Sequence, residues 1–111
     1  MELQNRSICE AFSQGNFTSV YSYFSEDIEW HIVGNKVVKG KVSVIDFCTK
    51  MLVEMTGAVL TNTNRIEAGN QIVIQGKCVY FDTEGKESVL HYCDCYGFEN
   101  NKIKMITSYC I

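Results

Sequence analysis

The first part of the chain carries a helical pattern of apolar positions. Over residues 3–13, apolar side chains recur at mixed three- and four-residue steps, the spacing of one helix face. The tripeptide "QGN" interrupts this pattern, which predicts Gly15 just past the helix end and Asn16 as the cap of the next helix. A short second helix is predicted over residues 17–24, and the polar "SED" ends it.

Apolar and polar positions alternate over residues 28–33, which predicts a β-strand. One side of this strand carries Ile28, Trp30 and Ile32, and the other carries Glu29, His31 and Val33. A turn and a short "VVKG" segment lead to a third predicted helix over residues 41–55, which has a broad apolar face.

After Gly57 the pattern becomes that of β-structure. Four β-rich runs are separated by short turn signals and cover residues 58–68, 71–82, 87–99 and 102–111. Turns this short join antiparallel neighbours, so a four-strand meander is predicted. Three helices followed by this meander indicate a single α+β domain over residues 1–111, in which helices cover one face of a curved sheet and leave a concave mouth for a small-molecule pocket.

Composition and charge narrow the partners. The chain has 111 residues and a formal net charge of −3, and its ten basic residues are scattered, so nucleic acid is not expected as a partner. The start "MELQNRSICEAF" lacks the pattern of a signal peptide, and no segment approaches about 18 consecutive apolar residues. We therefore expect a cytoplasmic protein without a membrane partner.

Six cysteines raise the question of disulfides or metal. Without an export signal and without a CxxC pair, free buried thiols are expected. Cys93 and Cys95 lie two apart on one face of a predicted strand, which suits packing better than zinc because no second ligand pair follows at metal-site spacing. Neither a metal nor a cofactor is expected.

Several segments, in order and spacing, carry a family resemblance. They are a helix, then "QGNFTSVYSYFSEDIEW", "VVKGKVSVIDF" and a strand running into "YCDCYGFENNKIKMITSY". The chain resembles the SnoaL-like branch of the nuclear transport factor 2-like superfamily, which includes ketosteroid isomerases and polyketide cyclases. The resemblance implies a cone-shaped, cystatin-like fold with three N-terminal helices packed in a curved, mainly antiparallel sheet. It also implies a small apolar ligand and commonly a homodimer through the outer face of the sheet.

In the ketosteroid isomerases the resemblance implies three working groups: a carboxylate base on the strand after the second helix, a tyrosine on the first helix and a protonated aspartic acid on a late strand. Counting back from Gly34, the base position falls on His31, and counting back from "GFENNKI", the acid falls on Asp94. The tyrosine position falls at or near Ile8, which has no hydroxyl. This departure counts against steroid isomerisation itself.

His31 is the first candidate catalytic residue. An imidazole with an ordinary pKa of about 6.5 can take and return protons at neutral pH, and Glu29 could orient one ring nitrogen. The alternative is that His31 fills its strand face, with its polar tip bonded to water or a backbone carbonyl.

Asp94 is the second candidate, because Tyr92 and Tyr96 flank it on one strand face in an otherwise apolar row. Desolvation should raise the pKa of its carboxyl, and a neutral acid could donate a hydrogen bond to a developing oxyanion. The alternative is an aspartate held by a tyrosine hydroxyl or by backbone amides at a sheet edge. The residues expected to bind a substrate are Tyr92, Tyr96, Phe12, Phe47 and Met51, with core packing as the alternative for Phe47 and Met51.

Three functions compete at this stage. The first is a cofactor-free isomerase, cyclase or lyase acting on an apolar carbonyl compound, with His31 as base and Asp94 as acid or oxyanion donor. The second is a non-catalytic pocket that uses both residues as hydrogen-bonding anchors. The third is a structural or protein-binding dimer whose cone is filled with side chains. We expect His91, Cys93 and Cys95 on the outer face, where a subunit interface would form.

Overall fold

The computed structural model describes residues 4–111. Two α-helices, one 3-10 helix (η1) and six strands follow in the order α1 (Asn5–Ser13), η1 (Thr18–Tyr23), β1 (Phe24–Ile32), β2 (Lys36–Lys39), α2 (Lys41–Glu54), β3 (Val59–Ala68), β4 (Gln71–Phe81), β5 (Glu87–Glu99) and β6 (Lys102–Cys110). The predicted helix start at Leu3 lies outside the described residues. The predicted α+β arrangement, helices followed by a meander of strands, is confirmed.

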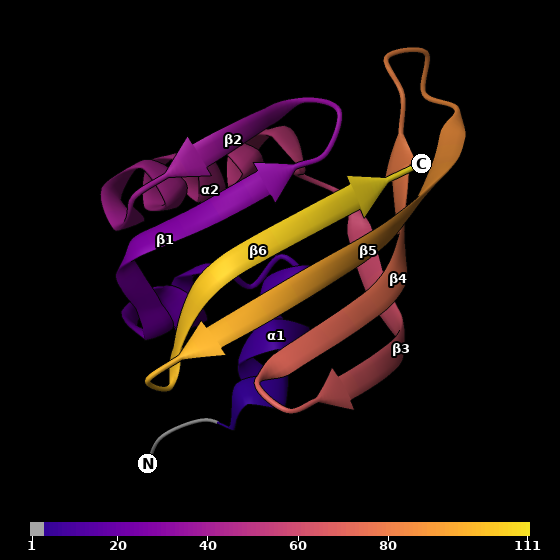
Figure 1. Cartoon of the computed structure of the whole chain (residues 1–111). Helices are drawn as coiled ribbons and strands as arrows, with labels where there is room; N and C mark the ends of the chain where they lie inside the picture. The colour runs from indigo at the N-terminus through magenta and orange to yellow at the C-terminus, as the bar shows by residue number, and fades with distance from the viewer. Residues whose placement is uncertain (1–3) are drawn as a thin grey trace.

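The six strands form one curved sheet in the order β2-β1-β6-β5-β4-β3. Strands β3 to β6 are the predicted antiparallel meander. Among the strands of residues 4–111 the one parallel pair is β1 with β6, which places the first strand beside the last in the middle of the sheet. Figure 1 looks onto the outer face of this sheet, with α1 and α2 behind it.

Two local signals act as the sequence predicts. Gly15 follows α1 with φ +86°, and the N–H groups of Gly15 and Asn16 donate to the carbonyls of Phe12 and Ala11 at 2.9 Å each, the Schellman pattern of a helix end. Between β5 and β6 the two-residue loop Asn100-Asn101 has positive φ at both positions, which matches the right-handed twist of a hairpin.

The second predicted helix differs from the structure. It is a 3-10 helix that begins at Thr18, so its N-cap position is Phe17 rather than Asn16, and no side chain caps it; the expected cap at Asn16 is wrong. Strand β1 already begins at Phe24, and residues 25–27 belong to it rather than ending a helix. The physical reason is that β6 provides a neighbouring strand for this segment: Phe24 is in register with Ile103.

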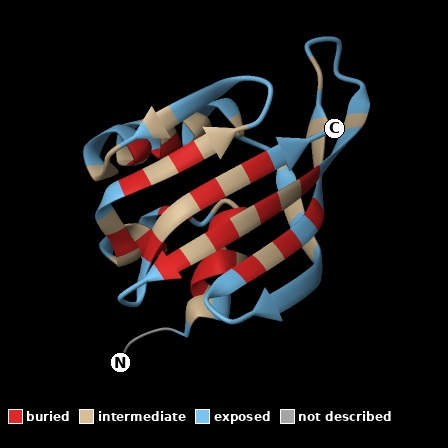
Figure 2. Ribbon diagram, in the orientation of Figure 1, coloured by how far each residue is buried: buried red, intermediate tan, exposed pale blue. Residues whose placement is uncertain are grey.

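Burial alternates along the central strands, as Figure 2 shows. On β5, Tyr92, Asp94, Tyr96 and Phe98 are buried, whereas Cys93 and Cys95 between them are only half-buried. The buried set faces α1 and α2, so the core lies between the helices and the concave face of the sheet. All six cysteines are free, although only Cys9 and Cys48 are buried.

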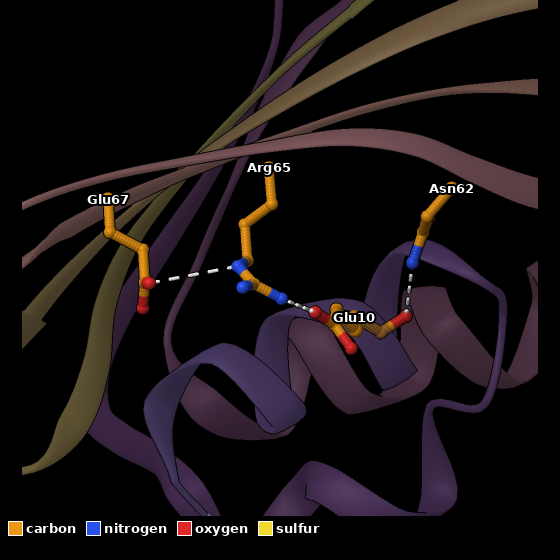
Figure 3. A network of polar contacts seen from close by, with 4 residues as sticks. All are labelled: Glu10, Asn62, Arg65 and Glu67. Atoms are coloured by element: carbon orange, nitrogen blue, oxygen red, sulfur yellow. Dashed lines mark hydrogen bonds and ion pairs between the residues drawn. The ribbon is translucent and has the colours of Figure 1, made fainter.

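Polar contacts fasten α1 to the edge strand β3 (Figure 3). Arg65 forms an ion pair with Glu10 of α1 and a second one, of 3.7 Å, with Glu67. Beside them, Asn62 Nδ2 donates to the backbone carbonyl of Glu10 at 3.0 Å. These contacts fix the end of α1 that carries Phe12 and Ser13. No helix within residues 4–111 is long and apolar enough to cross a membrane.

Candidate functional site

A cavity of about 310 Å³ lies between the two α-helices and the concave face of the sheet. Its lining is mainly aromatic and aliphatic and includes Phe12, Phe17, Trp30, Phe47, Met51 and Leu60. The polar side chains in the wall include Ser13, Asp94 and Ser108. A larger depression of about 460 Å³ lies beside Gln4 and Glu67, but it is shallow and contains none of the predicted site residues. We therefore take the apolar cavity as the candidate site.

Asp94 is the buried acid of this cavity, with 7% of its surface exposed. Its Oδ1 accepts a hydrogen bond of 2.7 Å from the hydroxyl of Ser108 on β6. Its Oδ2 accepts one of 2.8 Å from the hydroxyl of Ser13 at the end of α1. Two serines from opposite ends of the chain thus hold the carboxyl in place.

Each serine has a further partner. Trp30 Nε1 donates to Ser108 Oγ at 2.8 Å. The hydroxyls of Ser13 and Tyr96 lie 2.5 Å apart, and the backbone carbonyl of Cys9, 3.3 Å from the Tyr96 hydroxyl, is a second possible acceptor for that hydroxyl. Asp94 is therefore the centre of one hydrogen-bonded chain from β1 to α1.

Burial dominates the electrostatics of the site. Desolvation raises the pKa of Asp94, and the hydrogen bonds from Ser108 and Ser13 oppose this only in part. Burial, with the nearby charge of Asp94 second, raises the pKa of Tyr92 to about 12 and that of Tyr96 well above its usual value of 10.0. The predicted direction of the Asp94 shift agrees with these surroundings, and both tyrosines stay protonated at neutral pH.

His31 lies on the opposite face of the sheet, so the expectation that it shares a pocket with Asp94 is wrong. Trp30 points into the cavity, and the next residue on a strand must point away from it. On the outer face His31 Nε2 lies 2.9 Å from Glu29 Oε1, and the side chain is about one-third exposed. Counting back from the Gly34 turn located the right strand but the wrong side of it. Glu29 does hold one ring nitrogen of His31, as predicted, but the imidazole does not face the cavity.

The other predicted residues divide into two groups. Tyr92, Phe12, Phe47 and Met51 line the cavity. Tyr96 does not: it lies beneath the wall, fully buried, and contacts the site through Ser13. Ile8, at or near which the resemblance was expected to place a tyrosine, is a buried core residue.

Sequence reasoning missed Ser13 and Ser108. Both are buried serines, and both donate to Asp94. A signal existed for Ser13, because it directly follows Phe12 at the inward end of α1, and for Ser108, because it alternates in step with Ile106 on β6. Trp30 is buried in the core and also reaches the cavity. Within residues 4–111 no group of three or more His, Cys, Asp or Glu side chains is arranged to hold a metal ion.

Comparison with models of known protein families shows to which family the chain belongs. The SnoaL-like domain profile matches residues 6–106, nearly the entire chain. The chain belongs to the SnoaL-like domain family. A search of curated proteins found no significant match for this SnoaL-like domain.

Solved structures agree with this assignment. An NTF2-like protein of unknown function from Cytophaga hutchinsonii is 64% identical, with 96% of this chain and 95% of that chain covered and a TM-score of 0.93. A putative SnoaL-like polyketide cyclase from Jannaschia sp. shares 10% identity over 99% and 90% of the two chains, at a TM-score of 0.81. A protein with a ketosteroid isomerase-like fold from Catenulispora acidiphila, solved with trimethylamine, shares 11% over 96% and 86%, at 0.76. The predicted NTF2-like fold of this SnoaL-like domain is thus confirmed.

Proposed function

We propose that this SnoaL-like domain binds a small, largely apolar molecule in its cavity, with one polar group of that molecule against Asp94. The observation that carries the proposal is a buried carboxyl in the wall of an otherwise mainly apolar cavity. A volume of about 310 Å³ suits a molecule of one to three rings. The bound trimethylamine of the Catenulispora protein supports small-molecule binding on this fold.

The aromatic side chains give the cavity its shape preference. Phe12 contacts Trp30 edge-on, with ring centroids 5.1 Å apart, and Trp30 contacts Phe47 in the same manner at 5.3 Å. These rings come from α1, β1 and α2 and restrain one another, so the wall is largely preformed. Such a wall favours flat, apolar ligands with little loss of side-chain entropy on binding.

Fluorescence titration with 2-naphthol tests this proposal, because the probe joins a flat apolar bicycle to one hydroxyl donor. Met51→Trp should fill the cavity and abolish binding, whereas Leu52→Trp, on the exposed side of the same helix, should not. Asp94→Asn should weaken binding about tenfold, since a hydrogen bond to a charged acceptor is worth more than one to an amide. Naphthalene, which lacks the hydroxyl, should bind the native protein and Asp94→Asn equally. Unchanged 2-naphthol binding by Met51→Trp would place the ligand elsewhere.

A second candidate function is proton transfer next to a carbonyl group, with Asp94 acting without His31. The raised pKa of Asp94 favours it, because an acid that titrates closer to neutrality exchanges protons more effectively. In this reaction the Asp94 carboxylate takes a proton from carbon and leaves an enolate, then returns the proton. It corresponds to the isomerase, cyclase or lyase chemistry expected from the resemblance.

Deuterium exchange into 2-tetralone, followed by NMR in D2O, measures this step directly. We expect the protein to accelerate exchange at least about a hundredfold over buffer, the usual contribution of general acid–base catalysis. Asp94→Asn should lose the acceleration and His31→Ala should keep it. An equal loss in both variants would contradict the assignment of the base to Asp94.

We also propose a homodimer through the outer face of the sheet. The supporting observation is that neither α-helix covers this face, on which Cys95 is in register with Thr107 and Cys93 with Tyr109. Sedimentation at micromolar concentration should give a dimer for the native chain and a monomer for Thr107→Arg. Thr49→Arg, on the exposed side of α2, is the control and should remain dimeric. A native chain that sediments as a monomer would contradict the proposal.

A further inference from the structure

The hydrogen-bonded chain through Asp94 has one arm with a fixed direction. The indole N–H of Trp30 can only donate, so Ser108 Oγ accepts from it at 2.8 Å. The single hydroxyl hydrogen of Ser108 then points to Asp94 Oδ1, 2.7 Å away. Ser108 is therefore held as a donor to Asp94 whatever the protonation state of the carboxyl.

The other arm can run in two directions. When Asp94 is a carboxylate, Tyr96 donates to Ser13 and Ser13 donates to Asp94 Oδ2, over 2.5 and 2.8 Å. When Asp94 is an acid protonated on Oδ2, it donates to Ser13, Ser13 donates to Tyr96, and Tyr96 donates to the Cys9 carbonyl at 3.3 Å. Both arrangements satisfy every hydroxyl of the arm, because the Cys9 carbonyl is the last acceptor in the second one.

We propose that Ser13 and Tyr96 form a two-position hydrogen-bond switch that keeps Asp94 hydrogen-bonded both as carboxylate and as acid, and so makes it a reversible proton store beside the cavity. In proton uptake from solvent, one O–H bond of a hydronium ion breaks, one O–H bond forms at Oδ2, and the released water keeps the electron pair. The hydrogens of Ser13 and Tyr96 only rotate about their C–O bonds. The use of the stored proton rests on the proposed function, and Ser13 and Tyr96 are positioning residues for it.

The neighbouring titratable groups do not compete with Asp94 for this role. Burial raises the pKa of Cys9 on α1, Cys78 on β4 and Cys110 on β6, and it raises those of Tyr92 and Tyr96 on β5 as well. All five remain neutral while Asp94 titrates. From α2, Glu54 lines the cavity at its rim, where it is exposed. From β1 and the turn after it, Trp30, Ile32 and Asn35 line the cavity, and none of these three side chains titrates.

The test is the pKa of Asp94 in the ligand-free protein, measured by carboxyl carbon NMR in three variants. Ser13→Ala removes a donor to the carboxylate and should raise the pKa of Asp94 by about one pH unit, the size expected for one hydrogen bond. Ser108→Ala should raise it similarly. Tyr96→Phe should lower it, because the acid form then leaves the Ser13 hydroxyl without an acceptor. A Tyr96→Phe variant with a raised or unchanged pKa would overturn the switch, since Tyr96 would then act only as a donor or not at all. Glu54→Gln is the control and should change the pKa of Asp94 little.

A second measurement needs no variant. In the native protein the carbonyl carbon of Cys9 and the Tyr96 ring carbon that bears the hydroxyl should shift with the same midpoint as Asp94, because the Tyr96 hydrogen bond turns from Ser13 to Cys9. A Cys9 carbonyl signal that ignores this midpoint would overturn the switch even if a variant failed to fold. Both measurements use the empty protein. Failure of the switch is therefore distinct from failure of ligand binding, which 2-naphthol reports.

Discussion

Trp30 and Ser108 are 78 positions apart in the chain, yet the indole N–H of the first donates to the hydroxyl of the second at 2.8 Å. The contact is possible because β1 and β6 run parallel, with Ile32 in register with Ser108 and Trp30 with Ile106. Both side chains point into the concave face. The bond connects the aromatic wall of the cavity to the serine that holds Asp94.

The hydrogen bond between Trp30 and Ser108 should appear as a coupling energy in a double-mutant cycle of unfolding free energies. We expect Trp30→Phe and Ser108→Ala each to lower the free energy of unfolding by about 1–3 kcal/mol, since each removes a buried hydrogen bond. The double variant should cost about 1 kcal/mol less than the sum, because the shared bond is lost only once. Urea denaturation of the four proteins checks this, and strict additivity would mean that the bond contributes nothing to stability.

Asp94 should make stability fall as pH rises. In the unfolded chain its carboxyl ionises near the ordinary value of 3.8, whereas burial raises its pKa in the folded protein. From about pH 4 upward the unfolded state therefore loses this proton first, and unfolding becomes easier until the folded-state pKa is passed.

Asp94→Asn lacks this ionisation and serves as the reference. The free energy of unfolding of the native protein, minus that of the variant, should decrease from pH 4 to pH 7 by about 1.4 kcal/mol for each pH unit that separates the two pKa values. Urea titrations across this range give the difference. A difference that grows with pH would mean that the serine donors outweigh desolvation.

Asn62 should contribute more to stability than the ion pair beside it. Its Oδ1 accepts from the Tyr92 hydroxyl at 2.6 Å and its Nδ2 donates to the Glu10 carbonyl, so it connects α1 to the cavity wall. Asn62→Ala should cost about 1–3 kcal/mol, because it leaves the part-buried Tyr92 hydroxyl without its acceptor and removes the bond to the Glu10 carbonyl, which keeps only the Gln14 N–H as donor. Arg65→Met breaks two partly exposed ion pairs, with Glu10 and with Glu67, and should cost less than about 1 kcal/mol. Equal losses in thermal or urea unfolding would contradict this ranking.

Gly76 should tolerate no side chain. A Cβ atom there would lie 2.3 Å from the ring and hydroxyl of Tyr92 and 2.4 Å from the backbone oxygen of Thr61. Gly76→Ala must displace Tyr92 from the cavity wall or separate β3 from β4, so we expect a loss of about 3 kcal/mol or more. At Gly97 the nearest atom to an added Cβ is Met105 Cβ at 3.7 Å, an ordinary contact. Gly97→Ala should therefore cost less than about 1 kcal/mol in the same unfolding assay.

Features of the fold that depend on residues close together in the sequence were predicted, and those that depend on distant segments were not. The end of α1 at Gly15 and the Asn100-Asn101 hairpin depend on a few adjacent residues, and both were predicted. The extension of β1 back to Phe24 was missed, because it depends on pairing with a strand near the C-terminus. Local propensity alone favoured helix there, and the neighbouring strand overrode it.

The sequence by itself determined which residues share a strand face, and this sufficed to place Asp94 between Tyr92 and Tyr96 in a row that would desolvate it. Only the tertiary structure decided which face the helices cover, and therefore that Trp30 points inward and His31 outward. It also decided that Ser13 on α1 and Ser108 on β6, which lie far apart in the sequence, both donate to the carboxyl of Asp94. The reason is physical: strand alternation is set by bond geometry within a few residues, whereas the partners of a buried acid are set by how distant segments pack.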